Sequence, residues 1–113
     1  MPRGYWIVRV DVRNEEPVKR YVAGNHPIFE KFGGRYLVRA QKFEVPEGSS
    51  RSLHVVIEFP DYAAALACYH SREYQTNKKI REGHLVADSS LSKAMTASSH
   101  GAQRLLNDFP NFS

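Results

Sequence analysis

The chain is poor in cysteine and has no long apolar run. Cys68 is the only cysteine among 113 residues, so no disulfide can form within the chain, and a reduced, cytoplasmic setting is expected. No stretch of about 18 apolar residues is present, so no transmembrane helix is expected. Arg9 and Asp11 interrupt the first apolar segment, which argues against a secretory signal.

Sequence signatures of common cofactor and metal sites are also lacking. Gly33-Gly34 separates a predicted helix from a predicted strand, the reverse of the order in phosphate-binding loops. The histidines are widely spaced and no second cysteine accompanies them, so the sequence predicts no metal site and no cofactor. Cys68 lies in an alanine-rich segment and is expected to be buried and non-catalytic.

What is present is typical of one globular domain. Hydrophobic residues make up 42% and charged residues 25%. Sixteen Lys and Arg against twelve Asp and Glu give a net charge of +4. The basic residues are scattered, apart from the run Lys78-Lys79-Ile80-Arg81, which indicates a solvated, mildly basic surface. Nucleic-acid binding is the alternative, but the aromatic ribonucleoprotein motif is absent.

The hydrophobic pattern predicts three strands and an intervening helix in the first half of the chain. Apolar and polar residues alternate over residues 4–12 and 53–59, and residues 35–40 form a strand that continues toward Val45. A helix begins after Asn14 and ends at Gly33-Gly34. We expect a kink or break in it at Gly24–Pro27, since proline lacks an amide proton.

A second helical region follows, and the pattern then weakens. Asp61 caps a helix over residues 62–70, Ser71 caps further turns that end near Gly83, and the order becomes β-α-β-β-α. A closing strand would complete an α+β, ferredoxin-like split βαβ fold with a four-stranded antiparallel sheet in the order 4-1-3-2.

The end of the chain gives the least clear pattern. Residues 88–96 have little β-branched content, so the fourth strand is expected to be short, frayed or replaced by the tail. We therefore predict one domain over residues 1–96 and a tail over residues 97–113. The alternatives for the tail are disorder and a short docked helix near residues 102–107, and it could also exchange onto a partner subunit.

Several segments resemble the domain of unknown function 1330 family. They are GYWIVRVDV, KFGGRYLVR, the turn PEG, VVIEFPDYAAALACYHSREYQ and KIREG, and together they cover roughly residues 4–88. The pair IEFP-x-Y and Y-x-S-x-E-Y is the most specific part. The resemblance implies the dimeric α/β-barrel superfamily, in which the sheets of two protomers pack face to face. That superfamily includes cofactor-independent monooxygenases and isomerases, and fold alone does not assign a function.

Strand alternation places charged side chains on the sheet face opposite the helices. We expect an ionic cluster of Arg9, Glu58 and Arg39 there. The full set predicted for this face, which would become a dimer interface, is Arg9, Asp11, Arg35, Arg39, His54 and Glu58. Two arginines on one carboxylate could keep spare donors for an acidic ligand, or the cluster could serve assembly alone.

A second candidate group lies near the end of the second helix. Tyr69, His70 and Tyr74 have helical spacing, and a histidine beside tyrosines can act as a general base. The alternative is a partly buried helix end with satisfied hydrogen bonds. The candidate ligand-binding residues are Arg9, Arg39, Glu58, Tyr69, His70 and Tyr74.

Two functions remain open from the sequence. In the first, a homodimer binds a small anionic or aromatic metabolite, with or without cofactor-independent isomerisation or oxygenation. In the second, the chain is a non-catalytic dimeric module whose charged sheet face only specifies assembly. No membrane partner is expected in either case, and no individual catalytic residue is assigned.

Overall fold

The structure, a computed structural model, describes residues 2–95. Its elements are β1 (Gly4–Val12), α1 (Glu15–Lys31), β2 (Arg35–Ala40), β3 (Leu53–Phe59), α2 (Tyr62–His70), α3 (Arg72–Lys78), the 3-10 helix η1 (Lys79–Arg81) and β4 (Leu85–Lys93). The tail predicted for residues 97–113, with its candidate helix, lies outside the described residues.

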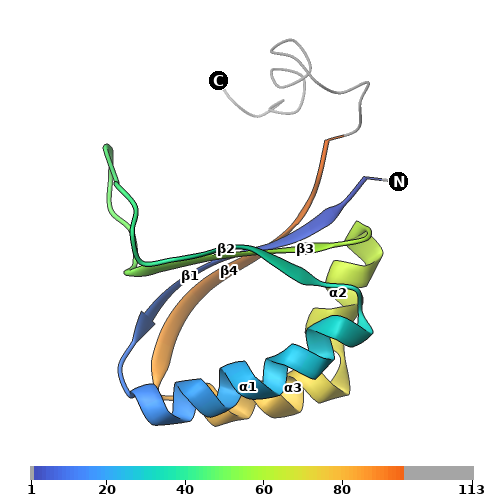
Figure 1. Ribbon diagram of the computed structural model, residues 1–113, viewed down its shortest axis with the longest axis horizontal. Helices are drawn as coiled ribbons and strands as arrows, with labels where there is room; N and C mark the ends of the chain where they lie inside the picture. The colour runs from blue at the N-terminus through green and yellow to red at the C-terminus, as the bar shows by residue number, and fades with distance from the viewer. Residues whose placement is uncertain (1, 96–113) are drawn as a thin grey trace, which may run out of the picture.

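The four strands form one antiparallel sheet in the order β2-β3-β1-β4. Figure 1 shows α1, α2 and α3 on one side of this sheet, while the loop between β2 and β3 projects to the other side. We call the side covered by helices the inner face and the other side the outer face. The predicted α+β, ferredoxin-like fold and its strand order are confirmed.

The closing strand is complete, and the expectation of a short or frayed strand was wrong. β4 pairs with β1 along its whole length, from Val12 opposite Leu85 to Gly4 opposite Lys93. Strand propensity depends strongly on context, and the full ladder with a central strand outweighs the serine-rich composition. In contrast, β2 ends at Ala40 and does not continue toward Val45.

Helix α1 is continuous through Gly24–Pro27, so the predicted break was also wrong. Asn77 of α3 packs closely against this segment. A Cβ at Gly24 would overlap the side-chain amide of Asn77. That amide donates to the carbonyl of Tyr21 and to Asn25 Oδ1, each at 2.9 Å. The side chain from α3 therefore satisfies polar groups of α1 in the turn before Pro27.

The helices begin at the predicted caps. Asp61 accepts a hydrogen bond from the amide of Ala64 at 2.7 Å, and the hydroxyl of Ser71 accepts one from the amide of Tyr74 at 3.1 Å. Gly33 ends the α1 region with a φ of 76°, a conformation that favours glycine. Within residues 2–95, no helix is both long enough and apolar enough to cross a membrane.

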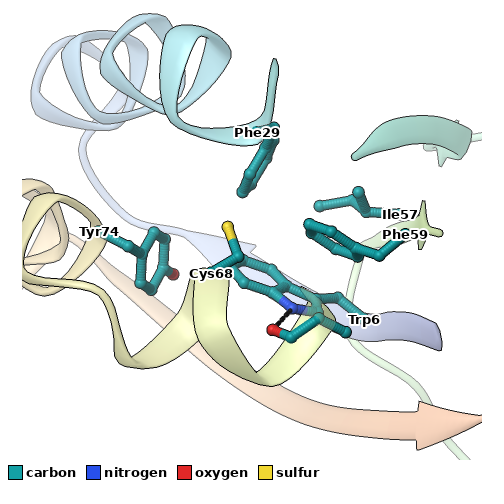
Figure 2. Close-up of a cluster of buried hydrophobic side chains, with 7 residues drawn as sticks. Trp6, Phe29, Ile57, Phe59, Cys68 and Tyr74 are labelled. Carbon is teal, nitrogen blue, oxygen red and sulfur yellow. Dashed lines mark hydrogen bonds between the residues drawn. The ribbon is translucent and has the colours of Figure 1, made fainter. Parts of the chain in front are cut away.

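The core lies between the inner face and the helices and is built around Trp6. Its indole packs edge-on against Phe29, with ring centroids 5.0 Å apart, and donates a hydrogen bond to the carbonyl of Ala65 at 2.9 Å. Figure 2 shows the surrounding side chains that converge on this ring. They include Phe59 and Cys68, both fully buried. The core fills one end of the space between the inner face of the sheet and the helices.

Candidate functional site

A cavity of about 310 Å³ continues from this core between the inner face and the helices. The inner-face positions of β1 and β3 supply its apolar floor. These floor residues are Trp6, Val8, Val10, Val12, Leu53, Val55 and Ile57. The volume is at the lower end of the range for small-molecule sites, and a mostly apolar lining with a few polar groups is typical of them.

A β-bulge directs Arg39 into this cavity. Arg35 lies opposite Glu58 on the outer face, but Val38, not Leu37, lies opposite Val56 because one residue is inserted in β2. This insertion shifts the alternation by one residue, so Arg39 lies on the inner face and lines the cavity. The prediction that Arg39 shares the polar face with Arg35 was therefore wrong.

Two tyrosines from different helices meet in the cavity wall. The hydroxyls of Tyr21 on α1 and Tyr74 on α3 lie 2.6 Å apart. Burial is the largest cause of a raised pKa for Tyr74, and its hydrogen-bonded partner Tyr21 adds to the effect. The Tyr74 phenol therefore remains protonated at neutral pH and lies at hydrogen-bond distance from the Tyr21 hydroxyl.

Arg81 lies next to this tyrosine pair. It is the last residue of η1, it lines the cavity, and its guanidinium carbon is 5.2 Å from the centre of the Tyr21 ring. Its Nε is the one buried side-chain nitrogen or oxygen in residues 2–95 without a hydrogen-bond partner. A cation over an aromatic face is attracted by the ring, but the Nε–H still lacks an acceptor.

On the outer face, Glu58 pairs with Arg35 and Tyr5 instead of Arg9 and Arg39. Arg35 Nε and the Tyr5 hydroxyl each donate to the Glu58 carboxylate at 3.0 Å. The hydrogen bond from Arg35 is the largest cause of the lowered pKa of Glu58. Arg9 lies opposite His54, not opposite Glu58, and makes no ion pair within residues 2–95. The predicted cluster of Arg9, Glu58 and Arg39 is not formed.

Asp11 belongs to a separate group on the outer face. Arg51, from the loop before β3, donates to Asp11 and to Asp88 of β4, each at 2.9 Å. Hydrogen bonds from Ser52 are the largest cause of the lowered pKa of Asp11, and Arg51 adds to it. The group ties the loop to two strands, and both carboxylates share the single guanidinium of Arg51.

His54 is occupied by contacts with the same loop. Its ring stacks on Phe43 with centroids 3.8 Å apart, and its Nε2 lies 2.6 Å from the hydroxyl of Ser50. These contacts hold the two ends of the projecting loop together. Within residues 2–95, no hydrogen bond or ion pair joins His54 to the Glu58 or Asp11 groups.

The predicted ligand-binding residues therefore fall into separate places. Arg39, Tyr69 and Tyr74 line the cavity. Arg9 and Glu58 lie on the opposite face of the sheet. His70 is exposed at the end of α2, with its ring 5.3 Å from Tyr69, and is not a lining residue. The structure thus assembles a cavity of phenols and arginines without a histidine among its described lining residues.

Sequence reasoning missed Tyr21 and Arg81. Tyr21 lies within the first predicted helix and was not singled out as a site residue, and Arg81 was assigned to a basic surface run. One signal was available: Tyr74 and Arg81 are seven residues apart, which places them on the same side of a helical segment. The approach of Tyr21 to that side depends on how α1 packs on α3, and no local pattern reports it.

Neither a metal site nor a reactive thiol is evident in the described part of the chain. Residues 2–95 contain no group of three or more His, Cys, Asp or Glu side chains that could hold a metal ion. Burial raises the pKa of the Cys68 thiol to about 12, so the thiolate that a nucleophile requires is scarce at neutral pH.

Solved structures with the same fold include proteins of unknown function and oxygenases. RPA0582 from Rhodopseudomonas palustris, of unknown function, has a TM-score of 0.69 at 17% identity, covering 84% of each chain. SnoaB from Streptomyces nogalater, a cofactor-independent oxygenase, has a TM-score of 0.58 at 13% identity, covering 88% of this chain and 100% of that one.

A third structure, a putative antibiotic biosynthesis monooxygenase from Nitrosomonas europaea, has a TM-score of 0.51 at 9% identity, covering 86% of this chain and 95% of that one. At these identities the similarity establishes the fold alone. No curated protein matches the chain in sequence. The family model described as Domain of unknown function (DUF1330) matches residues 3–95, and the chain therefore belongs to this family.

Proposed function

We propose that this protein is a homodimer that binds a small aromatic metabolite in the cavity between the helices and the inner face. The observation that supports this most directly is the cavity itself, about 310 Å³ with an apolar floor and phenol and guanidinium groups in its wall. An aromatic ring would bury apolar area on the floor, and the polar groups would set its orientation. Arg39, Tyr69 and Tyr74 are the predicted residues that contact the ligand.

In this proposal, dimer assembly is assigned to the outer face of the sheet and ligand binding to the cavity on its inner face. Arg9 makes no ion pair within residues 2–95, whereas Arg35 pairs with Glu58 and Arg51 pairs with Asp11 within the protomer. The paired charges therefore have little capacity left for an anionic ligand and are suited to assembly. The cavity on the inner face takes the ligand.

The outer face also carries apolar surface that a second copy would cover. Ile7, Val56 and Val38 lie opposite one another across β1, β3 and β2, and Ile7 is 41% exposed. Charged residues flank this row on both sides. A row of apolar side chains with a polar rim is the composition expected of a protein–protein interface. The β2–β3 loop, which projects on the same side, would reach past the edge of a partner (Figure 1).

The proposal assigns binding and no turnover. The fold is shared with a cofactor-independent oxygenase, but oxygenation or isomerisation by this route needs a base that takes a proton from the substrate. His70, the predicted base, is exposed and is not among the cavity-lining residues. The hydroxyls of Tyr21 and Tyr74 can donate hydrogen bonds, which suits recognition of a ligand oxygen.

Adjacent residues of β3 provide the test. Val55 faces the cavity, whereas Val56 faces outward. We expect 2-naphthol, a neutral two-ring probe, to bind the wild-type protein. Val55→Phe should fill the cavity and lower the affinity at least about tenfold, which corresponds to about 1.4 kcal/mol, while Val56→Phe should leave it unchanged. Fluorescence titration measures both, with circular dichroism to confirm folding. Absence of binding, or equal effects of the two variants, would contradict the proposed site.

A further inference from the structure

The cavity has one end that differs from the rest in charge. Arg81, Tyr21 and Tyr74 meet there, whereas the floor is made of valine, leucine and isoleucine side chains. Arg39 also lines the cavity, but its side chain is exposed and lies over Tyr36, with its guanidinium carbon 5.8 Å from the ring centre. Lys19, the third cation that lines the cavity, is also exposed and pairs with Glu16, so Arg81 is the only half-buried cation among the described lining residues.

Arg81 has donor capacity that the described protein does not use. Its Nε–H is buried without an acceptor, and within residues 2–95 no carboxylate lies at ion-pair distance from its guanidinium. Glu15 also lines the cavity, but it is exposed in the first turn of α1. A buried donor without an acceptor is unfavourable, and such a group calls for a missing partner.

The tyrosine pair supplies a second unused donor at the same place. One hydroxyl of Tyr21 and Tyr74 donates to the other across 2.6 Å, which consumes one of their two protons. No other side-chain partner of either hydroxyl occurs in residues 2–95, so the second proton is available. The guanidinium of Arg81 lies over the ring of Tyr21, so both kinds of donor serve one end of the cavity.

We propose that Arg81 and the Tyr21–Tyr74 hydroxyl pair form a carboxylate-binding end of the cavity, and that the ligand is a small aromatic carboxylate. This inference rests on the proposed ligand site and adds the chemical class of its ligand. The guanidinium fork matches the two oxygens of a carboxylate, and the free phenol proton adds a hydrogen bond to one of them. The ring of the ligand lies on the apolar floor, in a volume that admits one or two fused rings.

The test compares two probes that differ in their polar group, 2-naphthoate and 2-naphthol, in titrations near neutral pH. The wild-type protein should bind the naphthoate more tightly. Arg81→Met keeps the length of the side chain and removes its charge and donors. It should weaken naphthoate binding at least about tenfold, because hydrogen bonds to charged groups are the strong ones, and leave naphthol binding unchanged. Arg72→Met, at an exposed arginine of α3 that does not line the cavity, is the matched control and should change naphthoate binding by less than about threefold.

The possible results distinguish failure of the carboxylate site from failure of the whole ligand-binding cavity. If naphthol binds and Arg81→Met leaves naphthoate binding unchanged, the carboxylate site is wrong and the cavity stands. If Arg81→Met weakens both probes equally, Arg81 has a structural role and the inference fails. If neither probe binds the wild-type protein, the proposed function and the inference fail together. Should Arg81→Met not fold, Arg81→Lys retains the charge but loses the fork, and an unchanged naphthoate affinity in it contradicts bidentate recognition.

Discussion

At the scale of single residues, the charged groups of this protein have separate roles on the two sides of one sheet. Glu58 is nearly buried, with 11% of its side chain exposed, and accepts hydrogen bonds from Arg35 and Tyr5. Arg81 has an unpartnered donor on the other side. A buried charge must be compensated by partners. On the outer face the protein supplies the partner, and in the cavity we propose that the ligand does.

The paired state of Glu58 predicts a pH-dependent effect of its removal. Its folded-state pKa is lowered, mainly by Arg35, so ionised Glu58 stabilises the folded protein above the ordinary glutamate pKa of about 4.3. That stabilisation is lost as the pH falls through the lower, folded pKa. Glu58→Gln should therefore be less stable than the wild-type protein at neutral pH, and the difference should shrink in acid.

Urea unfolding at neutral pH and near pH 3, below the ordinary glutamate pKa of about 4.3, measures this change. The protein concentration must be held constant, since dimerisation would also affect stability. Glu47→Gln, in the exposed loop before β3, is the control and should have little effect at either pH. A stability difference for Glu58→Gln that persists in acid would contradict an ionic origin.

At the scale of elements, tertiary contacts override two local preferences. β4 is rich in serine, yet it pairs along the whole of β1. α1 contains Pro27, yet it runs without interruption from Glu15 to Lys31. For β4, the neighbouring strand β1 provides a complete ladder. For α1, Asn77 of α3 donates to the carbonyl of Tyr21 in the turn before the proline, although it does not replace the donor that Pro27 lacks.

The proline in α1 predicts a stabilising substitution. Pro27 is exposed and has no amide proton for the carbonyl of Ala23. Pro27→Ala should restore this hydrogen bond and raise the free energy of unfolding by about 1–3 kcal/mol. Pro17→Ala is the matched control, because Pro17 is in the first turn, where amides lack helical partners, and it should change stability by less than about 0.5 kcal/mol. Urea unfolding compares the two, and a loss of stability in Pro27→Ala would show that the helix depends on the proline.

At the scale of the whole molecule, we propose that the sheet separates the surface used for assembly from the cavity used for binding. The inner face and helices enclose the core and the cavity, and the outer face presents the row of Ile7, Val56 and Val38. If two copies pack through this row, each keeps its own cavity. The proposed ligand sites are then independent of the interface, except through the shared strands.

This arrangement predicts that one outer-face charge separates the subunits. The wild-type protein should have about twice its chain mass of 12.9 kDa by light scattering or native mass spectrometry. Ile7→Lys should give monomers, because an unpaired charge in an apolar interface is costly. Ile80→Lys changes an equally apolar, exposed residue on η1 and should leave the dimer intact. A monomeric wild-type protein would contradict the proposed interface.

Much of the fold could be predicted because the signals are local. Alternation in residues 4–12 and 53–59 correctly identified the inner face of two strands, and Asp61 and Ser71 correctly marked helix starts. The candidate site was predicted less well. Tyr69 and Tyr74 line the cavity, but Arg39 and His70 lie elsewhere than expected. Strand alternation assigned Arg39 to the wrong face because one residue is inserted in β2. Helical spacing alone does not show which side of a helix packs against the rest of the protein.

The sequence by itself determined the order of the elements, the apolar inner face and the strand order of the ferredoxin-like sheet. Only the tertiary structure decided which polar groups meet. The insertion in β2 appears as a bulge only when β2 pairs with β3, and this pairing turns Arg39 inward. Likewise, Tyr21 meets Tyr74 and Arg81 because α1 packs against α3 and η1. Alternation and helical spacing act within a few residues, whereas the pairing of Arg39 with Val55 joins residues 16 positions apart (55 − 39), and the contact of Tyr21 with Tyr74 joins residues 53 positions apart.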